Sequence, residues 1–299
     1  MSAAQRAVDG VVLLDKPSGI TSHTAMQKVR RLFNAAKAGH TGTLDPMATG
    51  LLPVCLGEAT KFSHLLLEAD KTYAATIRLD VTTTTGDLEG AITARFPVHV
   101  ERDKVAEVLR SFVGDILQIP PMYSAIKQGG KPLYQLARAG QEVPRAPRKI
   151  GIRSLTLIDL NGSELSVRVS CSKGTYVRVL AEDIGRGLAC GGCLSALRRE
   201  AVGSFALSPG AITLEQLEQL NPAGRDAALL PADVLVASLP RLDLDALETR
   251  RVSQGQPVER TGGHAAGLAR IYGPDHEFLG VVEITSPGRI VPKRLTARG

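Results

Sequence analysis

The sequence is poor in aromatic and sulfur-containing side chains. Its 299 residues include no tryptophan, five tyrosines, six phenylalanines, four cysteines and four methionines. Long hydrophobic runs are also missing: no apolar stretch approaches the roughly 18 residues that a membrane-spanning helix needs, and residues 1–10 lack the apolar core of a signal peptide. These absences argue against a membrane-spanning or secreted protein and predict a cytoplasmic one with reduced cysteines.

Cofactor and metal motifs are missing as well. There is no P-loop spacing, no glycine-rich dinucleotide fingerprint after a strand, and the six histidines are scattered without metal-ligand spacing. Cys190 and Cys193 form a CxxC pair, but zinc would need two further ligands at matching spacing, and Cys55 and Cys171 are single and distant. The sequence therefore predicts no metal and no cofactor.

What is present fits a folded, globular protein. Hydrophobic residues make up 43% and charged residues 22% of the chain, unlike the composition of a disordered protein. The length allows one large domain or two, and it is ample for a buried core without disulfides or metals.

The net charge of +6 is concentrated in one segment. Residues 120–153 contain seven basic side chains and one acid, whereas the other 265 residues carry 29 of each sign. Five prolines in the same segment leave room for no more than a short helix over residues 133–139. Clustered positive charge on a long irregular loop is typical of phosphate binding. A flexible basic loop without a specific partner is the alternative that the charges alone leave open.

Hydrophobic periodicity predicts mixed secondary structure in the first half. Residues 11–15 and 73–81 are strand candidates, and the second alternates cleanly between two faces. Thr21 or Ser22 is expected to cap the helix after the first strand. Residues 38–57 contain too many glycines, threonines and prolines for regular structure over most of their length.

The second half begins with a predicted hairpin. Residues 152–160 and 165–171 alternate as its two strands, and Thr175 is expected to cap the helix that follows. From about residue 239 the helical patterns end, and short strand candidates such as residues 267–271 and 278–284 predict a small β domain of about 60 residues.

Two glycine-punctuated segments carry side chains suited to chemistry. In GHTGTLDPMATG, Pro46 favours an extended backbone at Asp45, and Gly50 allows a tight turn or close approach to a ligand. This pattern fits an ordinary Asp-Pro turn or a carboxylate presented near the imidazole of His40. In CSKGTYVR, a strand end, a glycine turn and a helix start can hold phosphate, or form an ordinary turn with Arg178 in a surface ion pair.

The first of these segments closely resembles a motif of bacterial tRNA pseudouridine-55 synthases of the TruB family. The resemblance continues in collinear order through LLDKPSGITS, LGEATKF, DKTYAATIRLD, IPPMYSAIKQGGKPLYQLARAGQEVPR, CSKGTYVRVLAEDIG and LRREAVG. It covers about residues 10–205, and several long motifs are far more specific than one short pattern. The C-terminal part matches less distinctly and resembles a small PUA-type RNA-binding domain.

This resemblance implies an α+β fold, with a mixed, largely antiparallel sheet flanked by helices and loops. The catalytic domain would span residues 1–238, with the basic segment at about 120–153 as a thumb-like insertion, called the thumb below. A β-rich, PUA-like domain would span residues 239–299. The implied partner is the T arm of tRNA; no protein partner is implied, and the chain is expected to be a monomer.

The resemblance also implies the reaction. Uridine 55 in the T loop would be isomerised to pseudouridine: the N1–C1′ bond breaks, the base rotates, and C5 bonds to C1′. Asp45 matches the catalytic aspartate, whose carboxylate suits a nucleophile or a base. Attack on the sugar, attack on the uracil ring and proton abstraction at C2′ stay open. Arg178 would pair with Asp45 and keep it ionised, and Tyr73 matches the tyrosine that stacks on the uracil.

Other matching positions imply contacts with RNA. His40 matches the histidine that fills the gap left by the extruded base, Tyr176 and Leu197 match pocket walls, and Asp87 matches a position that contacts flipped loop bases. Thr84 stands where most relatives have an acid, which puts that acid's role in doubt. The remaining predicted tRNA contacts are the basic side chains Lys16, Lys127, Lys131, Arg138, Arg145 and Arg148.

Two other functions are alternatives to a pseudouridine synthase. An RNA-binding or tRNA-folding protein could use the thumb and the C-terminal domain without chemistry, but a carboxylate such as Asp45 would only weaken its hold on an anionic ligand. The two functions can also coexist in one chain. A metal-dependent nuclease would need clustered carboxylates, which the sequence lacks.

Overall fold

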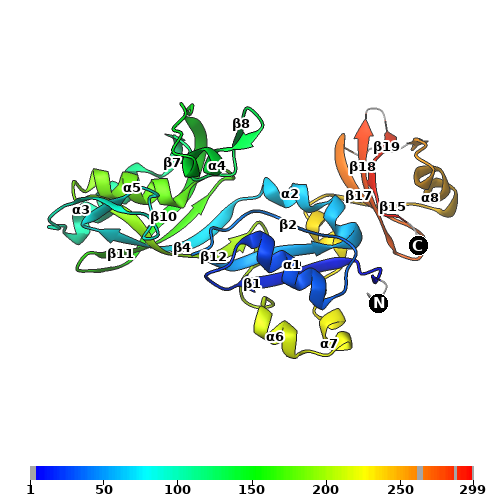
Figure 1. Cartoon of the computed structure of the whole chain (residues 1–299). Helices are drawn as coiled ribbons and strands as arrows, with labels where there is room; N and C mark the ends of the chain where they lie inside the picture. Colours follow the sequence, from blue (N-terminus) through cyan, green and yellow to red (C-terminus); the bar gives the residue numbers. More distant parts are fainter. Residues whose placement is uncertain (1–4, 261–264, 286–287, 298–299) are drawn as a thin grey trace. The chain divides into compact units, whose positions relative to one another are not determined.

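The structure is a computed structural model that describes residues 5–260, 265–285 and 288–297. The chain forms two compact units (Figure 1). The first contains Met1–Asp45, Leu52–Leu67 and Gly210–Gly299, and the second contains Pro46–Leu51 and Glu68–Pro209. The predicted division between a catalytic and a C-terminal domain at residues 238 and 239 concerns function and stays a prediction.

In the first unit, four strands of a ten-stranded sheet accompany the N-terminal helix. Strand β1 (Gly10–Lys16) pairs in parallel with β14 (Ile212–Thr213), and β2 (Ala38–His40) pairs antiparallel to β3 (Thr49–Leu56). Helix α1 (Ser22–Leu32) follows β1 and is capped by the Thr21 hydroxyl, which accepts a hydrogen bond from the backbone N–H of Thr24. One of the two predicted caps is thereby confirmed.

Short helices complete this part of the first unit. They are η1 (Gly57–Lys61), α2 (Ser63–Leu67), α6 (Leu214–Gln219), α7 (Pro222–Ala227) and η2 (Ala232–Val236). Helix α6 begins with a capping box in which Thr213 and Gln216 satisfy each other's backbone N–H groups.

The second unit is built on six neighbouring strands of a ten-stranded sheet. Its strands follow the order β3–β12–β4–β11–β10–β7, in which β3 contributes its first residues. The new strands are β12 (Gly192–Val202), β4 (Lys71–Leu79), β11 (Glu164–Cys171), β10 (Arg148–Asn161) and β7 (Gly114–Gln118). All neighbours are antiparallel except β3 and β12, and the predicted hairpin is the β10–β11 pair.

Helices and small hairpins surround this sheet. Helix α3 (Arg102–Ser111) packs on β10, and α5 (Val177–Gly187) packs on β12 and β4 (Figure 1). The smaller elements are β5 (Val81–Thr83), β6 (Ile92–Arg95), β8 (Lys127–Gln128), β9 (Lys131–Pro132), α4 (Leu133–Arg138) and β13 (Phe205–Ala206). Helix α4 confirms the short helix predicted within the thumb.

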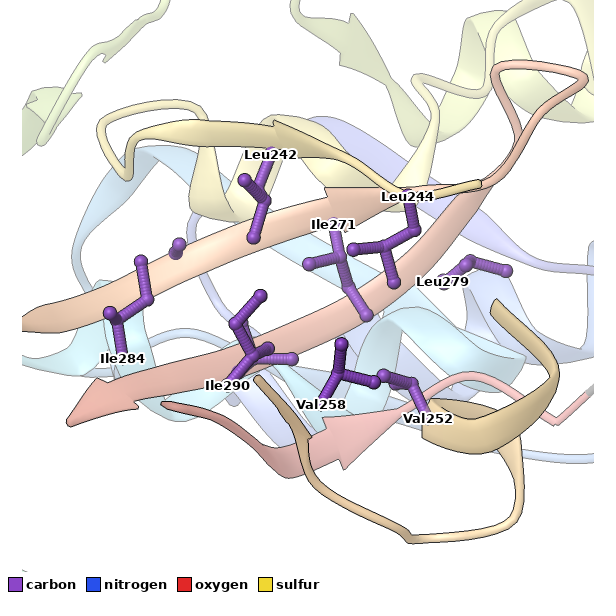
Figure 2. Close-up of a cluster of buried hydrophobic side chains, with 10 residues drawn as sticks. Leu242, Leu244, Val252, Val258, Ile271, Leu279, Ile284 and Ile290 are labelled. Carbon is purple, nitrogen blue, oxygen red and sulfur yellow. The ribbon is translucent and has the colours of Figure 1, made fainter. Parts of the chain in front are cut away.

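The C-terminal part of the first unit has its own sheet and core. The strand order is β15 (Arg241–Asp243), β17 (Gly267–Tyr272), β18 (Phe278–Thr285), β19 (Arg289–Leu295) and β16 (Val258–Glu259). Their buried aliphatic side chains pack with those of α8 (Ala246–Ser253), and Val252 of this helix points into the cluster (Figure 2). Together with the mixed sheets, this β-rich region confirms the predicted α+β fold.

Three local predictions were wrong. Residues 38–57 include β2 and β3, because the apolar run of β3 forms a strand despite Pro53. The N-cap of α5 is Tyr176 and not Thr175, whose hydroxyl donates to the Ser172 carbonyl. Helix formation does not end near residue 239, since Asp245 starts α8 with a capping box.

Within the described residues, no helix is long and apolar enough to cross a bilayer.

Candidate functional site

The loop that carries Asp45 is anchored through its preceding residue. Ser22, buried at the start of α1, accepts a hydrogen bond from the Leu44 N–H at 2.8 Å and donates one to the Leu44 carbonyl at 3.1 Å. One hydroxyl therefore satisfies both backbone groups of the residue before Asp45. Ser22 ends the LLDKPSGITS motif, so its position in that motif was the available sequence signal for a supporting role.

Two other predicted site residues belong to the same unit as Asp45. His40 ends β2, and its Nδ1 accepts a hydrogen bond from the Gly42 N–H at 3.4 Å. Lys16 ends β1 with its side chain fully buried, and its Nζ donates to the carbonyls of Pro17 and Ile20, each at 2.8 Å. Lys16 thus braces the turn into α1, and its contact with tRNA stays a prediction.

Tyr73 and Leu197 lie on one buried face of the second unit. In the antiparallel pair β4–β12, Tyr73 is opposite Arg199 and Ala75 is opposite Leu197. Directly opposed residues share a face of the sheet, and the two candidates are only 9% and 7% exposed. The structure therefore places these two candidates on the same face of adjacent strands, and their role in a uridine pocket stays a prediction.

Gly50 brings the chain after Asp45 onto the backbone of β12. It is opposite Arg199 in the β3–β12 pair and has a φ of +103°. A methyl group at this position would come within 2.3 Å of the Arg199 carbonyl oxygen. The glycine is required by the approach of another strand, whereas the sequence left open a turn or a ligand.

Gly50→Ala is expected to destabilise the protein by about 2–5 kcal/mol, because it combines a left-handed backbone with a steric clash. The control is Gly162→Ala in the β10–β11 turn, where φ is +58° and no atom lies within 4 Å of the added carbon. That change should cost only about 1 kcal/mol. Denaturant unfolding of both variants tests this, and equal losses would contradict the close approach.

Arg178 is held in a cradle of carbonyl oxygens and one carboxylate. It lies in the first turn of α5 and is 5% exposed. Its two terminal nitrogens donate to the Thr85 carbonyl at 3.0 Å and the Tyr123 carbonyl at 2.7 Å, and its Nε lies 3.7 Å from Oδ2 of Asp87. Two segments distant in sequence, residues 85–87 and the one that contains Tyr123, therefore orient this guanidinium.

Asp87 is itself buried and hydrogen-bonded. The Thr85 hydroxyl and the Glu89 N–H donate to its Oδ1, and the Thr83 hydroxyl donates to its carbonyl. This geometry gives Asp87 a role in supporting Arg178 that the sequence did not predict. Its predicted contact with flipped bases stays a prediction.

Tyr176 is positioned by a glutamine that precedes the thumb. Gln118, at the end of β7, accepts from the Tyr176 N–H at 2.8 Å and donates to the Tyr176 carbonyl at 3.2 Å. Together with the bond from Arg178 to the Tyr123 carbonyl, this attaches the chain around the start of the thumb to the KGTYVR segment at two points. No pattern in the sequence pointed to Gln118, because the bond joins residues 58 positions apart.

The thumb carries both paired and unpaired basic side chains. Arg145 is bound by Glu142 at 3.0 Å and by the Pro120 carbonyl, so it braces the base of the thumb. Lys149 and Arg153 pair with Asp115 and Asp70, which lie outside the thumb. Of the described basic residues of the thumb, four are exposed and have no acid at ion-pair distance: Lys127, Lys131, Arg138 and Arg148.

A cavity of about 460 Å³ lies beside the cradle of Arg178. Thr85 and Tyr123 line it together with Glu182 and Asp183, and burial raises the pKa of both carboxyls. Of the predicted site residues, Arg145 reaches this cavity, and Tyr73, Tyr176 and Leu197 are not part of its lining. It is therefore separate from the face that carries the predicted uridine pocket.

The four cysteines are free and buried. Burial raises the pKa of the Cys193 thiol to about 11 and that of Cys55 to about 12. The thiolate is the reactive and metal-binding form, so these thiols are poorly suited to redox or ligand chemistry at neutral pH.

Three family models match consecutive parts of the chain. The TruB family pseudouridylate synthase N-terminal domain matches residues 30–177, and the tRNA pseudouridylate synthase B C-terminal domain matches residues 178–237. The C-terminal model of pseudouridine synthase II TruB matches residues 240–296. The matches therefore run through nearly the whole sequence.

Curated relatives and solved structures agree with this. A tRNA pseudouridine synthase B of Aromatoleum aromaticum is 55% identical over 98% of this chain and 94% of its own length, and one of Dechloromonas aromatica is 54% identical over 98% and 97%. A crystal structure of a Cbf5–Nop10–Gar1 complex contains a chain that matches with a TM-score of 0.74 and 27% identity, covering 96% of this chain and 85% of that one. An H/ACA RNP bound to a substrate RNA gives the same TM-score at 25% identity, covering 97% and 85%.

Proposed function

The chain belongs to the TruB family of pseudouridylate synthases, and from this premise we propose that it isomerises uridine 55 in the T arm of tRNA to pseudouridine. The observation that carries the proposal is the 55% identity to a tRNA pseudouridine synthase B over 98% of the chain. The products contain the same atoms as the substrate: the N1–C1′ bond is broken, C5–C1′ is formed, and the hydrogen leaving C5 is balanced by one gained at N1.

Asp45 supplies the carboxylate of this reaction. A carboxylate can act as a nucleophile or as a base, and the double hydrogen bond from Ser22 to Leu44 holds the backbone immediately before it. In this proposal Arg178 is the charge partner of Asp45. The cradle around Arg178 supports this assignment, because the carbonyls of Thr85 and Tyr123 fix the direction of the guanidinium.

The chain that follows Asp45 enters the second unit within one residue. Asp45 directly precedes Pro46, the first residue of the second unit. Four peptide units separate Asp45 from Thr49 on β3, so their Cα atoms are at most about 15 Å apart. The next residue, Gly50, is opposite Arg199, and Arg199 is opposite Tyr73.

The target base must leave the stacked T loop before it can react. Tyr73 stacks on the extruded uracil, with Tyr176 and Leu197 as pocket walls, and His40 fills the gap left in the loop. The thumb binds phosphates of the tRNA arm. Asp87 contacts flipped bases of the loop, and Lys16 is a further contact with the tRNA. The enzyme is a cytoplasmic monomer that needs no metal or cofactor, and it can also assist tRNA folding through binding alone.

The test uses the purified full-length chain and unmodified tRNA that carries tritium at C5 of uridine. We expect release of one tritium per tRNA and pseudouridine at position 55. Absence of release with every tRNA of a bacterial pool would overturn the proposal. Release that maps to another uridine would keep pseudouridine formation and overturn the assignment to position 55.

A further inference from the structure

Arg199 is among the most deeply buried charged side chains of the described residues. It lies on β12 between two neighbours, opposite Gly50 of β3 and Tyr73 of β4, and is 1% exposed. Taking a guanidinium out of water is costly unless hydrogen bonds replace the lost solvent. An arginine at this position is therefore expected to have a role beyond packing.

The hydrogen bonds of Arg199 point to Tyr73. Its Nε donates to the Leu51 carbonyl at 2.7 Å, and the guanidinium also bonds to the Tyr73 hydroxyl. Arginine has donors only, so the phenol oxygen is the acceptor in this bond. The hydroxyl hydrogen of Tyr73 is consequently left to donate to a different acceptor.

The backbone around Arg199 is built to hold this geometry. The β4–β12 pairing shifts register between Arg199 and Ala201, which leaves Glu200 as an extra residue in β12. Such bulges re-aim neighbouring side chains and are frequent beside active sites. On the other side, the tight approach of Gly50 sets the position of the Arg199 peptide.

We propose that Arg199 is a positioning residue that acts through Tyr73. It orients the phenol so that the hydroxyl hydrogen faces the bound uridine, and its charge stabilises negative charge on the phenol oxygen whenever that hydrogen is shared with the substrate. The inference rests on the proposed function, since Tyr73 must face a uridine for the orientation to matter. It adds to that function a residue that does not itself touch the base.

The test is a double-substitution cycle measured by single-turnover tritium release. Arg199→Lys keeps the charge but loses the fork that bonds two acceptors at once, and we expect a rate about 10- to 100-fold lower. The affinity for tRNA should stay within about twofold, because Arg199 is buried beneath the pocket. In a Tyr73→Phe background, the same Arg199→Lys change should cause no further loss, since the oxygen through which it acts is gone.

The control is Arg168→Lys on the adjacent strand β11, where Arg168 forms an exposed ion pair with Glu200. Its rate should equal that of the wild type. Equal slowing by Arg199→Lys with and without the Tyr73 hydroxyl would overturn the proposal, as would an unchanged rate. If neither Arg199→Lys nor Arg199→Gln folds, by melting temperature, Arg199 serves folding and the proposal fails. A wild-type protein without activity would instead refute the proposed function.

Discussion

Asp45→Asn is expected to abolish pseudouridine formation while the protein stays folded. The substitution keeps the size of the side chain but removes the charge and basicity that either a nucleophile or a base requires. We expect the single-turnover rate of tritium release to fall by at least about 10³-fold. The anchor from Ser22 binds the backbone of Leu44, so the loop does not depend on the Asp45 carboxylate for that contact.

The matched control is Asp103→Asn, which removes a carboxylate from the exposed first turn of α3. It should release tritium at the wild-type rate. Asp45→Asn should still bind tRNA, which separates catalysis from binding or folding of the RNA. A rate above a tenth of wild type would refute the catalytic assignment, and a collapsed melting temperature would make Asp45 a structural residue.

Removing the unpaired charges of the thumb is expected to weaken tRNA binding and flatten its salt dependence. The variant replaces four exposed side chains by glutamine: Lys127, Lys131, Arg138 and Arg148. Each phosphate contact on a duplex contributes about 0.9 to the slope of log K against log salt, so four lost contacts reduce the slope by about 3.6. Filter binding between 50 and 200 mM salt, about the range over which this effect is large, measures it.

Lys149→Gln with Arg153→Gln provides the control for this variant. Both side chains belong to the thumb but are paired with Asp115 and Asp70. Because their charges are already compensated, the slope should change by less than about 0.5. An unchanged slope in the fourfold variant, or an equal loss per charge in the control, would mean that the exposed thumb charges are not the phosphate contacts.

The face that carries Tyr73 illustrates what periodicity can predict. Apolar residues occupy every second position of β4 from Tyr73 to Leu79, and these are buried, as is Lys71 at the start of the strand. A period of two fixes which side chains share a face. It contains no information on which strand lies opposite, so the pairing of Tyr73 with Arg199 and of Ala75 with Leu197 could not be predicted from it.

The support of Arg178 shows a second limit. The motif KGTYVR identified the residue, but its partners are carbonyls of Thr85 and Tyr123, 93 and 55 positions away. Every residue has a carbonyl, so composition and spacing carry no signal for such bonds. The same reason hid Gln118, whose side chain binds the backbone of Tyr176.

Counting charges along the sequence located the basic segment correctly but did not show which of its side chains form ion pairs. Counting by position located all of the excess positive charge in residues 120–153. Folding then divides these side chains, because Asp115 and Asp70 reach Lys149 and Arg153 from outside the segment, and Arg145 turns back to its base. The four exposed cations are the part of the charge that is free to meet phosphate.

The sequence by itself therefore determined the family motifs, the alternating strands, the helix cap at Thr21 and the location of the basic segment. These depend on local backbone preference and on the order of residues. The tertiary structure alone decided which faces meet, which charges are neutralised and how Arg178 and Arg199 are held. Those contacts join residues far apart in the chain, and their energies depend on burial and geometry that exist only after folding.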